Sequence, residues 1–195
     1  MKGSIAALLL GIAGLAGALQ ANAAVINFGA TLNGANWDPD VATPATGTAL
    51  VQLDTLAHTL RVQVSFSGLL GNSTASHIHC CTAGPLTGLA GVATTVPTFA
   101  GFPLGVTSGS YQQELDLTLA SSYNPVFVTA NGGTVAGAEA ALTAGMLDER
   151  SYLVIHSTFR PAGEIRGFLQ VPEPTTLALL GLGLAGLAAT RRRKQ

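Results

Sequence analysis

The sequence predicts a mainly β protein, an antiparallel β-sandwich or flattened barrel with one short helix, carrying hydrophobic helices at its two ends. Three observations predict this class. Several short segments alternate apolar and polar residues, which is typical of strands with one buried face. Turn residues such as Asn33-Gly34 and Pro161-Ala162-Gly163 separate these segments. Uncharged apolar runs lie at both chain ends, so they must be set aside before the domain is analysed.

The first 23 residues have the features of a secretory signal peptide. Lys2 precedes an apolar run from Ile5 to Leu19, which is short for a membrane span. The small residues of Ala21-Asn22-Ala23 fit a signal peptidase site, which predicts cleavage between Ala23 and Ala24. An uncleaved N-terminal anchor is the alternative. We therefore expect export by the general secretory route.

Strand patterns fill much of the remaining domain, residues 24–171. The clearest is 60–67, which alternates strictly and should form a hairpin with 48–53. The Ala-rich segment 136–147 predicts the short helix, and 80–109, rich in Gly, Pro and Thr, predicts a long ordered loop. The other predicted strands are 25–32, 114–119, 126–129, 152–156 and 164–170.

The charges of this domain argue against some partners. Residues 24–171 contain nine acidic and four basic residues, a net charge of −5. Because no basic patch is present, nucleic acid is not an expected partner. We also find no nucleophile elbow and no phosphate-binding loop, so no catalytic residue is assigned and the protein is not expected to be an enzyme.

Two histidines, His77 and His79, form the first candidate site. His77 and His79 flank Ile78, and on a strand their side chains would share one face. Imidazole pairs of this kind can bind first-row metals such as copper or zinc. Histidines held by hydrogen bonds at a strand end are the alternative.

The end of the domain carries a second polar cluster. His156 closes an apolar strand, and after a turn the next strand begins with Glu164 and Arg166. Glu164 and Arg166 are two residues apart, so they could share a strand face and form a structural ion pair.

Cys80 and Cys81 are the only cysteines. An even count in an exported protein indicates a disulfide, although adjacent cysteines close only a small ring. We rank a vicinal disulfide or a reduced pair first and a metal-ligating thiolate beside His79 second. Pairing with another chain is the remaining alternative.

Together these motifs resemble the CHRD domain, named after chordin and frequent in bacterial secreted proteins. The resemblance rests on His77-Ile78-His79 and on Ile155-His156 followed by Gly163-Glu164-Ile165-Arg166-Gly167, and it covers most of residues 25–170. It departs at Cys80-Cys81, where Gly-Pro is common. The resemblance implies an immunoglobulin-like sandwich with some similarity to copper/zinc superoxide dismutases, and a molecular function that is not established.

The dismutase similarity makes His77, His79, His156 and Arg166 the counterparts of a copper-side arrangement. The remaining histidine, His58, falls in a predicted turn, and no His-rich zinc loop is present. A two-metal dismutase site is therefore not expected. A mononuclear copper or zinc site of three histidines is the form that the resemblance leaves open.

The C-terminal 24 residues resemble the PEP-CTERM sorting signal. Pro172-Glu173-Pro174 is followed by an uncharged apolar stretch and then by Arg191-Arg192-Arg193-Lys194. The basic cluster would stay cytoplasmic, so the tail would hold the exported domain at the inner membrane. The resemblance implies cleavage near the motif by an exosortase-type enzyme and release towards the cell surface. An ordinary permanent anchor is the alternative.

The chain therefore divides into a signal peptide (1–23), a CHRD-like domain (24–171) and a sorting segment (172–195). We expect a non-catalytic binding or structural module at the cell surface or in the extracellular matrix, whose partners would be extracellular polysaccharide or surface proteins. The alternative is a copper- or zinc-binding protein, with dismutase-like redox activity, that uses the three histidines.

Overall fold

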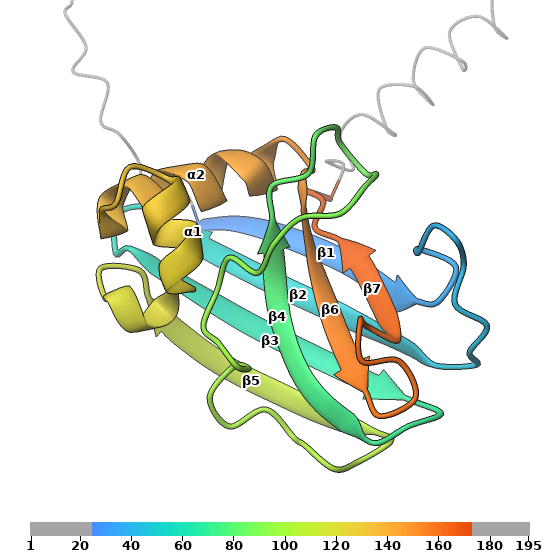
Figure 1. Cartoon of the computed structure of the whole chain (residues 1–195). Helices are drawn as coiled ribbons and strands as arrows, with labels where there is room; N and C mark the ends of the chain where they lie inside the picture. The colour runs from blue at the N-terminus through green and yellow to red at the C-terminus, as the bar shows by residue number, and fades with distance from the viewer. Residues whose placement is uncertain (1–24, 173–195) are drawn as a thin grey trace, which may run out of the picture.

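A computed structural model describes residues 25–172. Seven strands form a single antiparallel sheet, and three helical segments lie between the fifth and sixth strands (Figure 1). The strands are β1 (Val25–Asn33), β2 (Thr46–Asp54), β3 (Thr59–Ser67), β4 (Ser73–Cys80), β5 (Gly109–Asp116), β6 (Ser151–Ser157) and β7 (Ile165–Phe168). The helical segments are η1 (Ala120–Ser122), α1 (Pro125–Ala130) and α2 (Val135–Leu147).

The sheet has the order β4-β6-β7-β1-β2-β3-β5 and curls into a half-barrel. It bends between β7 and β1, where the ladder consists of Asn33 opposite Arg166. Gly167 permits this close crossing, because a Cβ atom there would lie 2.5 Å from the carbonyl oxygen of Thr31. The predicted sandwich or flattened barrel is thus confirmed as one curled sheet.

The alternating sequence pattern places the core inside this curl. In β3, Leu60, Val62 and Val64 are buried, while the residues between them face outward. The predicted hairpin is confirmed, with β2 and β3 paired along their whole length. Apolar residues of every strand and of both α-helices contribute to this core.

Helix α2 confirms the predicted helix. The Thr134 hydroxyl caps it by accepting from the backbone N–H of Gly137 at 3.1 Å. The buried side of α2 carries Ala138, Leu142 and Met146. The helix packs against β4 and β6.

The predicted strand at 126–129 is wrong, because these residues belong to α1. The Asn124 side chain caps this helix by accepting from the Val126 N–H at 3.0 Å. Pro125 then occupies the first helical position, where its missing N–H costs nothing. The cap and the proline override the strand preference of the two valines.

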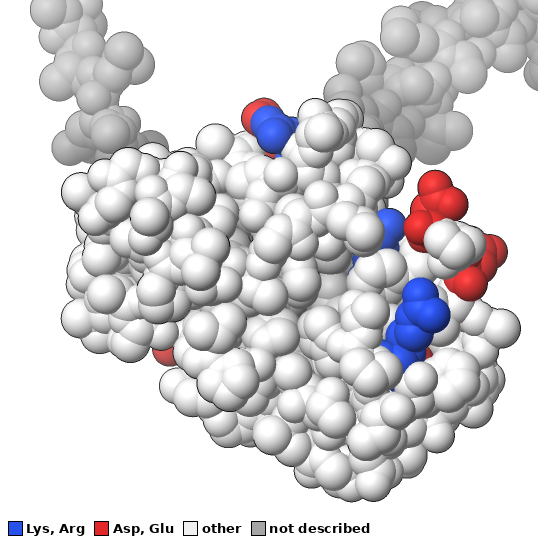
Figure 2. All heavy atoms as spheres, in the orientation of Figure 1, with Lys and Arg blue, Asp and Glu red and all other residues white. Residues whose placement is uncertain are grey.

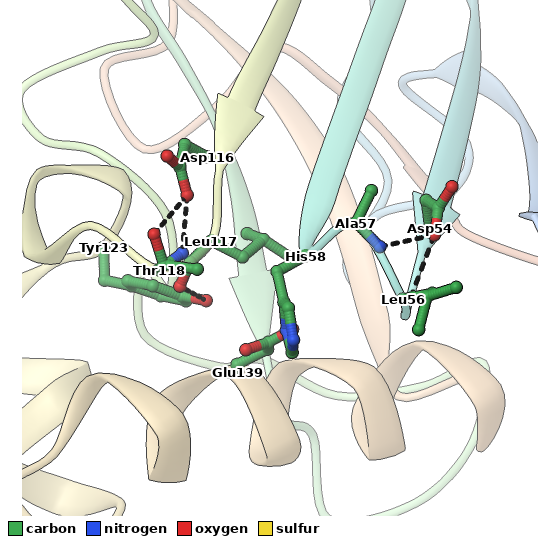
Figure 3. Close-up of polar contacts among 9 residues, drawn as sticks. All are labelled: Asp54, Leu56, Ala57, His58, Asp116, Leu117, Thr118, Tyr123 and Glu139. Carbon is green, nitrogen blue, oxygen red and sulfur yellow. Dashed lines mark hydrogen bonds and ion pairs between the residues drawn. The ribbon is translucent and has the colours of Figure 1, made fainter. Parts of the chain in front are cut away.

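The predicted strand at 114–119 is only partly correct, since β5 begins earlier and ends at Asp116. The Asp116 carboxylate accepts from both the backbone N–H (2.8 Å) and the hydroxyl (2.6 Å) of Thr118, as Figure 3 shows. This local turn diverts the chain away from the ladder.

Residues 81–108 form the long ordered loop that the sequence predicts, and they run over β4 (Figure 1). The N–H groups of Ala93 and Phe99 donate to the carbonyl oxygens of Ile78 and Ser76 at 2.9 and 3.1 Å. The loop thereby satisfies backbone groups of an edge strand, which would otherwise be open to other chains. It also covers the outward-facing side chains of β4.

Candidate metal centre

Two paired strands bring the three predicted histidines together. His77 and His79 alternate with Ile78 along β4, so they point outward while Ile78 enters the core. In the antiparallel neighbour β6, Val154 lies opposite His77, and His156 lies two residues further along. His156 is therefore a diagonal neighbour of His77 on the same outward face.

The three imidazoles form a compact cluster. Each offers one ring nitrogen, and these nitrogens lie within 4.8 Å of one another. The ring centroids of His77 and His156 are 5.0 Å apart, and those of His79 lie 5.8 Å from His77 and 5.9 Å from His156. Three nitrogens that shared one zinc or copper ion would be about 3.3 Å apart, so small side-chain rotations would close the set around a metal.

Backbone carbonyls hold each ring through its other nitrogen. Because a carbonyl only accepts, that nitrogen must carry the proton. The contacts are His77 Nε2 to Pro97 O (2.5 Å), His79 Nδ1 to Ala90 O (2.9 Å) and His156 Nδ1 to Pro161 O (2.9 Å).

The remaining nitrogens are consequently bare. They are His77 Nδ1, His79 Nε2 and His156 Nε2, and all three are buried without a hydrogen-bond partner among the described residues. Buried polar atoms are nearly always paired, so three unpaired imidazole nitrogens at one place are an unusual feature of this fold. This is the arrangement in which metal-binding histidines are usually held, with the second N–H fixed by an outer acceptor.

The electrostatics keep the cluster neutral. The pKa of His79 is lowered to about 4, mainly by burial and also by the nearby His156, His77 and Arg166, against the hydrogen bond to Ala90 that raises it. Burial also lowers the pKa values of His77 and His156, each partly opposed by its hydrogen bond to a carbonyl. Neutral imidazole is the form that binds metal, so the cluster is ready to do so near neutral pH.

Cys80 and Cys81 lie apart from this cluster. They form a vicinal disulfide, and both sulfur atoms face the carbonyl oxygen of Ala141 in α2, at 3.9 and 3.5 Å. Cys80 alternates with His79 along β4 and enters the core. A vicinal disulfide was one of the two states that we ranked first, and it is the one present. The alternative of cysteine thiolates as metal ligands is not supported, because neither cysteine belongs to the histidine cluster.

The predicted ion pair between Glu164 and Arg166 is not formed in residues 25–172. The buried Glu164 carboxylate instead accepts from Thr43 Oγ1 (2.6 Å), the N–H groups of Leu70 (2.7 Å) and Gly71 (3.4 Å), and the Ser157 hydroxyl. Burial raises the pKa of Glu164, but these hydrogen bonds outweigh it and the net shift is downward. The two-residue spacing of Glu164 and Arg166 is not sufficient for an ion pair, because other donors satisfy the Glu164 carboxylate. They are Thr43, Leu70, Gly71 and Ser157.

Arg166 belongs to an aromatic environment beside the histidines. Its Nε donates to the Asn36 carbonyl (2.6 Å) and its guanidinium to the Gly88 carbonyl (2.8 Å). The guanidinium carbon lies 4.5 Å from the ring centroid of Trp37, within cation–π range. Trp37 therefore packs on a buried cation.

The fourth histidine lies at a different part of the molecule. His58 occupies the β2–β3 turn, as predicted, and its Nδ1 lies 2.7 Å from a carboxylate oxygen of Glu139 in α2 (Figure 3). It is not part of the cluster.

The sequence analysis missed the carbonyl groups that orient the rings. Those of Pro97 and Ala90 belong to the long loop, and that of Pro161 to the β6–β7 turn. No residue type marks a backbone acceptor, so the available signal was only that a long ordered loop is often functional.

On the face that Figure 2 shows, with β4 and this loop towards the viewer, charged side chains are few.

The expected signal peptide and terminal helices lie outside the described residues, as do Glu173 and Pro174 of the sorting motif. Within residues 25–172, no helix is long and apolar enough to cross a membrane.

Comparison with known proteins fits this organisation. The family model of the CHRD domain matches residues 28–169, and that of the PEP-CTERM protein-sorting motif matches residues 170–194. Searches of curated proteins and of solved structures give no match. The sorting motif implies processing by an exosortase and export to the surface. The chain belongs to the CHRD domain family and carries a PEP-CTERM sorting motif after the domain.

Proposed function

We propose that this exosortase-sorted extracellular protein is a metal-binding module that holds one zinc or copper ion through His77, His79 and His156. The observation that supports the proposal is the convergence of three buried, unpaired imidazole nitrogens within 4.8 Å. Each is left bare because a carbonyl fixes the proton on the other nitrogen of its ring.

The donor set indicates the metal. Imidazole nitrogens suit zinc and copper, whereas calcium and magnesium require oxygen ligands. The histidines would hold the ion, and the carbonyl groups of Pro97, Ala90 and Pro161 would keep their rings oriented. A bound zinc or copper ion would supply a Lewis-acid centre, and copper would also supply a redox couple.

The sequence-based expectation of a non-catalytic binding or structural module is compatible with this site. An ion with three protein ligands keeps a position for a further ligand, and a group from a surface protein or an extracellular polysaccharide could occupy it. The same open position supports the alternative, a dismutase-like redox role with copper.

Metal titration of the purified protein tests the proposal. We expect one zinc or copper ion per chain by elemental analysis, and at least a 100-fold weaker affinity in His77→Ala and His156→Ala. His58→Ala is the matched control and should bind normally, because His58 contacts Glu139 instead of the cluster. Absence of metal from the wild type, or equal binding by all variants, would refute the proposal.

A dismutase assay of the copper-loaded protein then separates the two roles. Turnover that is lost with His156→Ala would support the redox alternative. A loaded but inactive protein would support the binding module.

A further inference from the structure

We infer that Tyr152 is a positioning residue of the metal centre, which sets the orientation of His79 through both its hydroxyl and its ring. The inference rests on the proposed function, because it assigns a role at the same histidine cluster. Tyr152 lies in β6 directly opposite His79 in β4, and its side chain is 1% exposed.

The hydroxyl of Tyr152 fixes the acceptor of His79. The backbone N–H of Ala90 donates to this hydroxyl at 2.9 Å, and the hydroxyl lies 3.2 Å from the Ala90 carbonyl oxygen, to which it donates. The same carbonyl oxygen accepts from His79 Nδ1 at 2.9 Å. Ala90 lies in the loop 81–108, outside any helix or strand. Tyr152 therefore anchors this irregular loop at the residue whose carbonyl oxygen accepts from His79.

The ring of Tyr152 limits the rotation of the same imidazole. The His79 and Tyr152 rings stack with centroids 5.1 Å apart and an interplanar angle of 15°. Tyr152 is itself held by Phe168, whose ring centroid is 5.2 Å away, and by the Arg166 guanidinium carbon at 4.9 Å. A turn of His79 about its Cβ–Cγ bond would therefore break the stack as well as the hydrogen bond.

These two constraints have one consequence for binding. They keep the proton of His79 on Nδ1 and leave the Nε2 lone pair towards His77 and His156. His77 bonds to the carbonyl of Pro97, further along the same loop, and His156 to that of Pro161 in the β6–β7 turn. Among the described residues, no side-chain hydroxyl bonds to those two carbonyls. Outer groups of this kind typically change metal affinity 10- to 100-fold when they are removed.

Tyr123 provides a matched control for a purely structural tyrosine. It is also buried, and its hydroxyl donates to a backbone carbonyl, that of Leu117, at 3.0 Å (Figure 3). Tyr123 does not contact the histidine cluster. Loss of the Tyr123 hydroxyl removes one hydrogen bond to a backbone group, and loss of the Tyr152 hydroxyl removes two, so both variants should lose thermal stability.

The test compares Tyr152→Phe and Tyr123→Phe by zinc competition titration and by the Cu²⁺ electron paramagnetic resonance spectrum. For Tyr152→Phe we expect a metal affinity lower by about 10-fold or more and an altered copper hyperfine splitting. The ring still stacks on His79, but the Ala90 carbonyl loses its hydrogen bond from the tyrosine hydroxyl. For Tyr123→Phe, both readouts should equal the wild type despite a loss of thermal stability. Wild-type affinity and an unchanged spectrum in Tyr152→Phe would overturn the inference.

If the wild type takes up no metal, the proposed function is overturned. The positioning role of Tyr152 can still be tested in that case. Nitrogen-15 NMR of the metal-free protein then reports the His79 tautomer. We expect a single Nδ1–H form in the wild type and in Tyr123→Phe, and a mixture of tautomers in Tyr152→Phe. One unchanged tautomer in Tyr152→Phe would refute the positioning role.

Discussion

His79 shows how single residues determine the behaviour of the site. It sits half-buried between two other imidazoles and near Arg166, and these surroundings all oppose its protonation. A residue with a free pKa of about 6.5 therefore stays neutral in the folded protein down to a pH of about 4. The same features that leave its lone pair available to a metal thus make the fold sensitive to acid.

This sensitivity predicts the pH dependence of the metal-free protein. Between about pH 6.5 and 4 the unfolded chain binds a proton at His79 that the folded chain does not, so stability falls as the pH falls. It should be fully present above pH 6.5, and urea unfolding in chelator should show the loss below. His77 and His156 add to it in the same direction.

One variant isolates the contribution of His79. His79→Gln removes one titrating group, so its free energy of unfolding should change less between pH 7 and 4.5. Identical pH profiles for wild type and His79→Gln would contradict this explanation.

At the level of secondary-structure elements, the disulfide forms the contact between the end of β4 and helix α2. Gly145 of α2 leaves room for it, because a Cβ atom at that position would lie 2.3 Å from the Cys80 sulfur and 2.4 Å from the Cys81 sulfur. The glycine that weakens the helical pattern in the sequence is therefore needed by its packing partner.

This contact predicts the effect of Gly145→Ala. The added methyl group should push α2 away from β4 and destabilise the protein by about 1–3 kcal/mol, the usual cost of overpacking. In a Cys80→Ala/Cys81→Ala background the same substitution should cost much less. Urea unfolding of the wild type and the three variants gives the coupling energy, and a cost independent of the cysteines would show that the contact is unimportant.

The elements also show where sequence reasoning succeeds. Strict alternation identified β3 and its hairpin with β2, because burial of one face leaves a period of two. It failed at 126–129, where the Asn124 cap and Pro125 outweigh the valines. For the site, strand spacing placed His77 and His79 on one face, whereas His156 was added by the family resemblance. Sequence reasoning could not predict the carbonyl acceptors or the partners of Glu164, because loop geometry is not encoded by spacing.

At the scale of the whole molecule, the domain is the part that reaches the surface and the tail is the part that directs it there. The PEP-CTERM match covers residues 170–194, directly after the CHRD match ends. The last strand, β7, ends at Phe168, so cleavage near the motif would leave the sheet complete.

Processing of the tail is therefore expected to release an intact domain. Mass spectrometry of the surface-released protein should find a C-terminus near Pro172 and none of the four terminal basic residues. Substitution of Pro172, Glu173 and Pro174 by alanine should retain the protein in the membrane fraction, whereas Glu149→Ala within the domain should not. Release of a protein that still carries Arg191–Lys194 would contradict processing.

X-ray absorption at the metal edge of the zinc- or copper-loaded protein tests the central claim most directly. The account predicts three imidazole nitrogens at about 2.0–2.1 Å from one ion, with the imidazole scattering reduced in His77→Ala and unchanged in His58→Ala. A sulfur ligand at about 2.3 Å, a shell of oxygen ligands alone, or a spectrum that His77→Ala leaves unaltered would contradict the three-histidine centre.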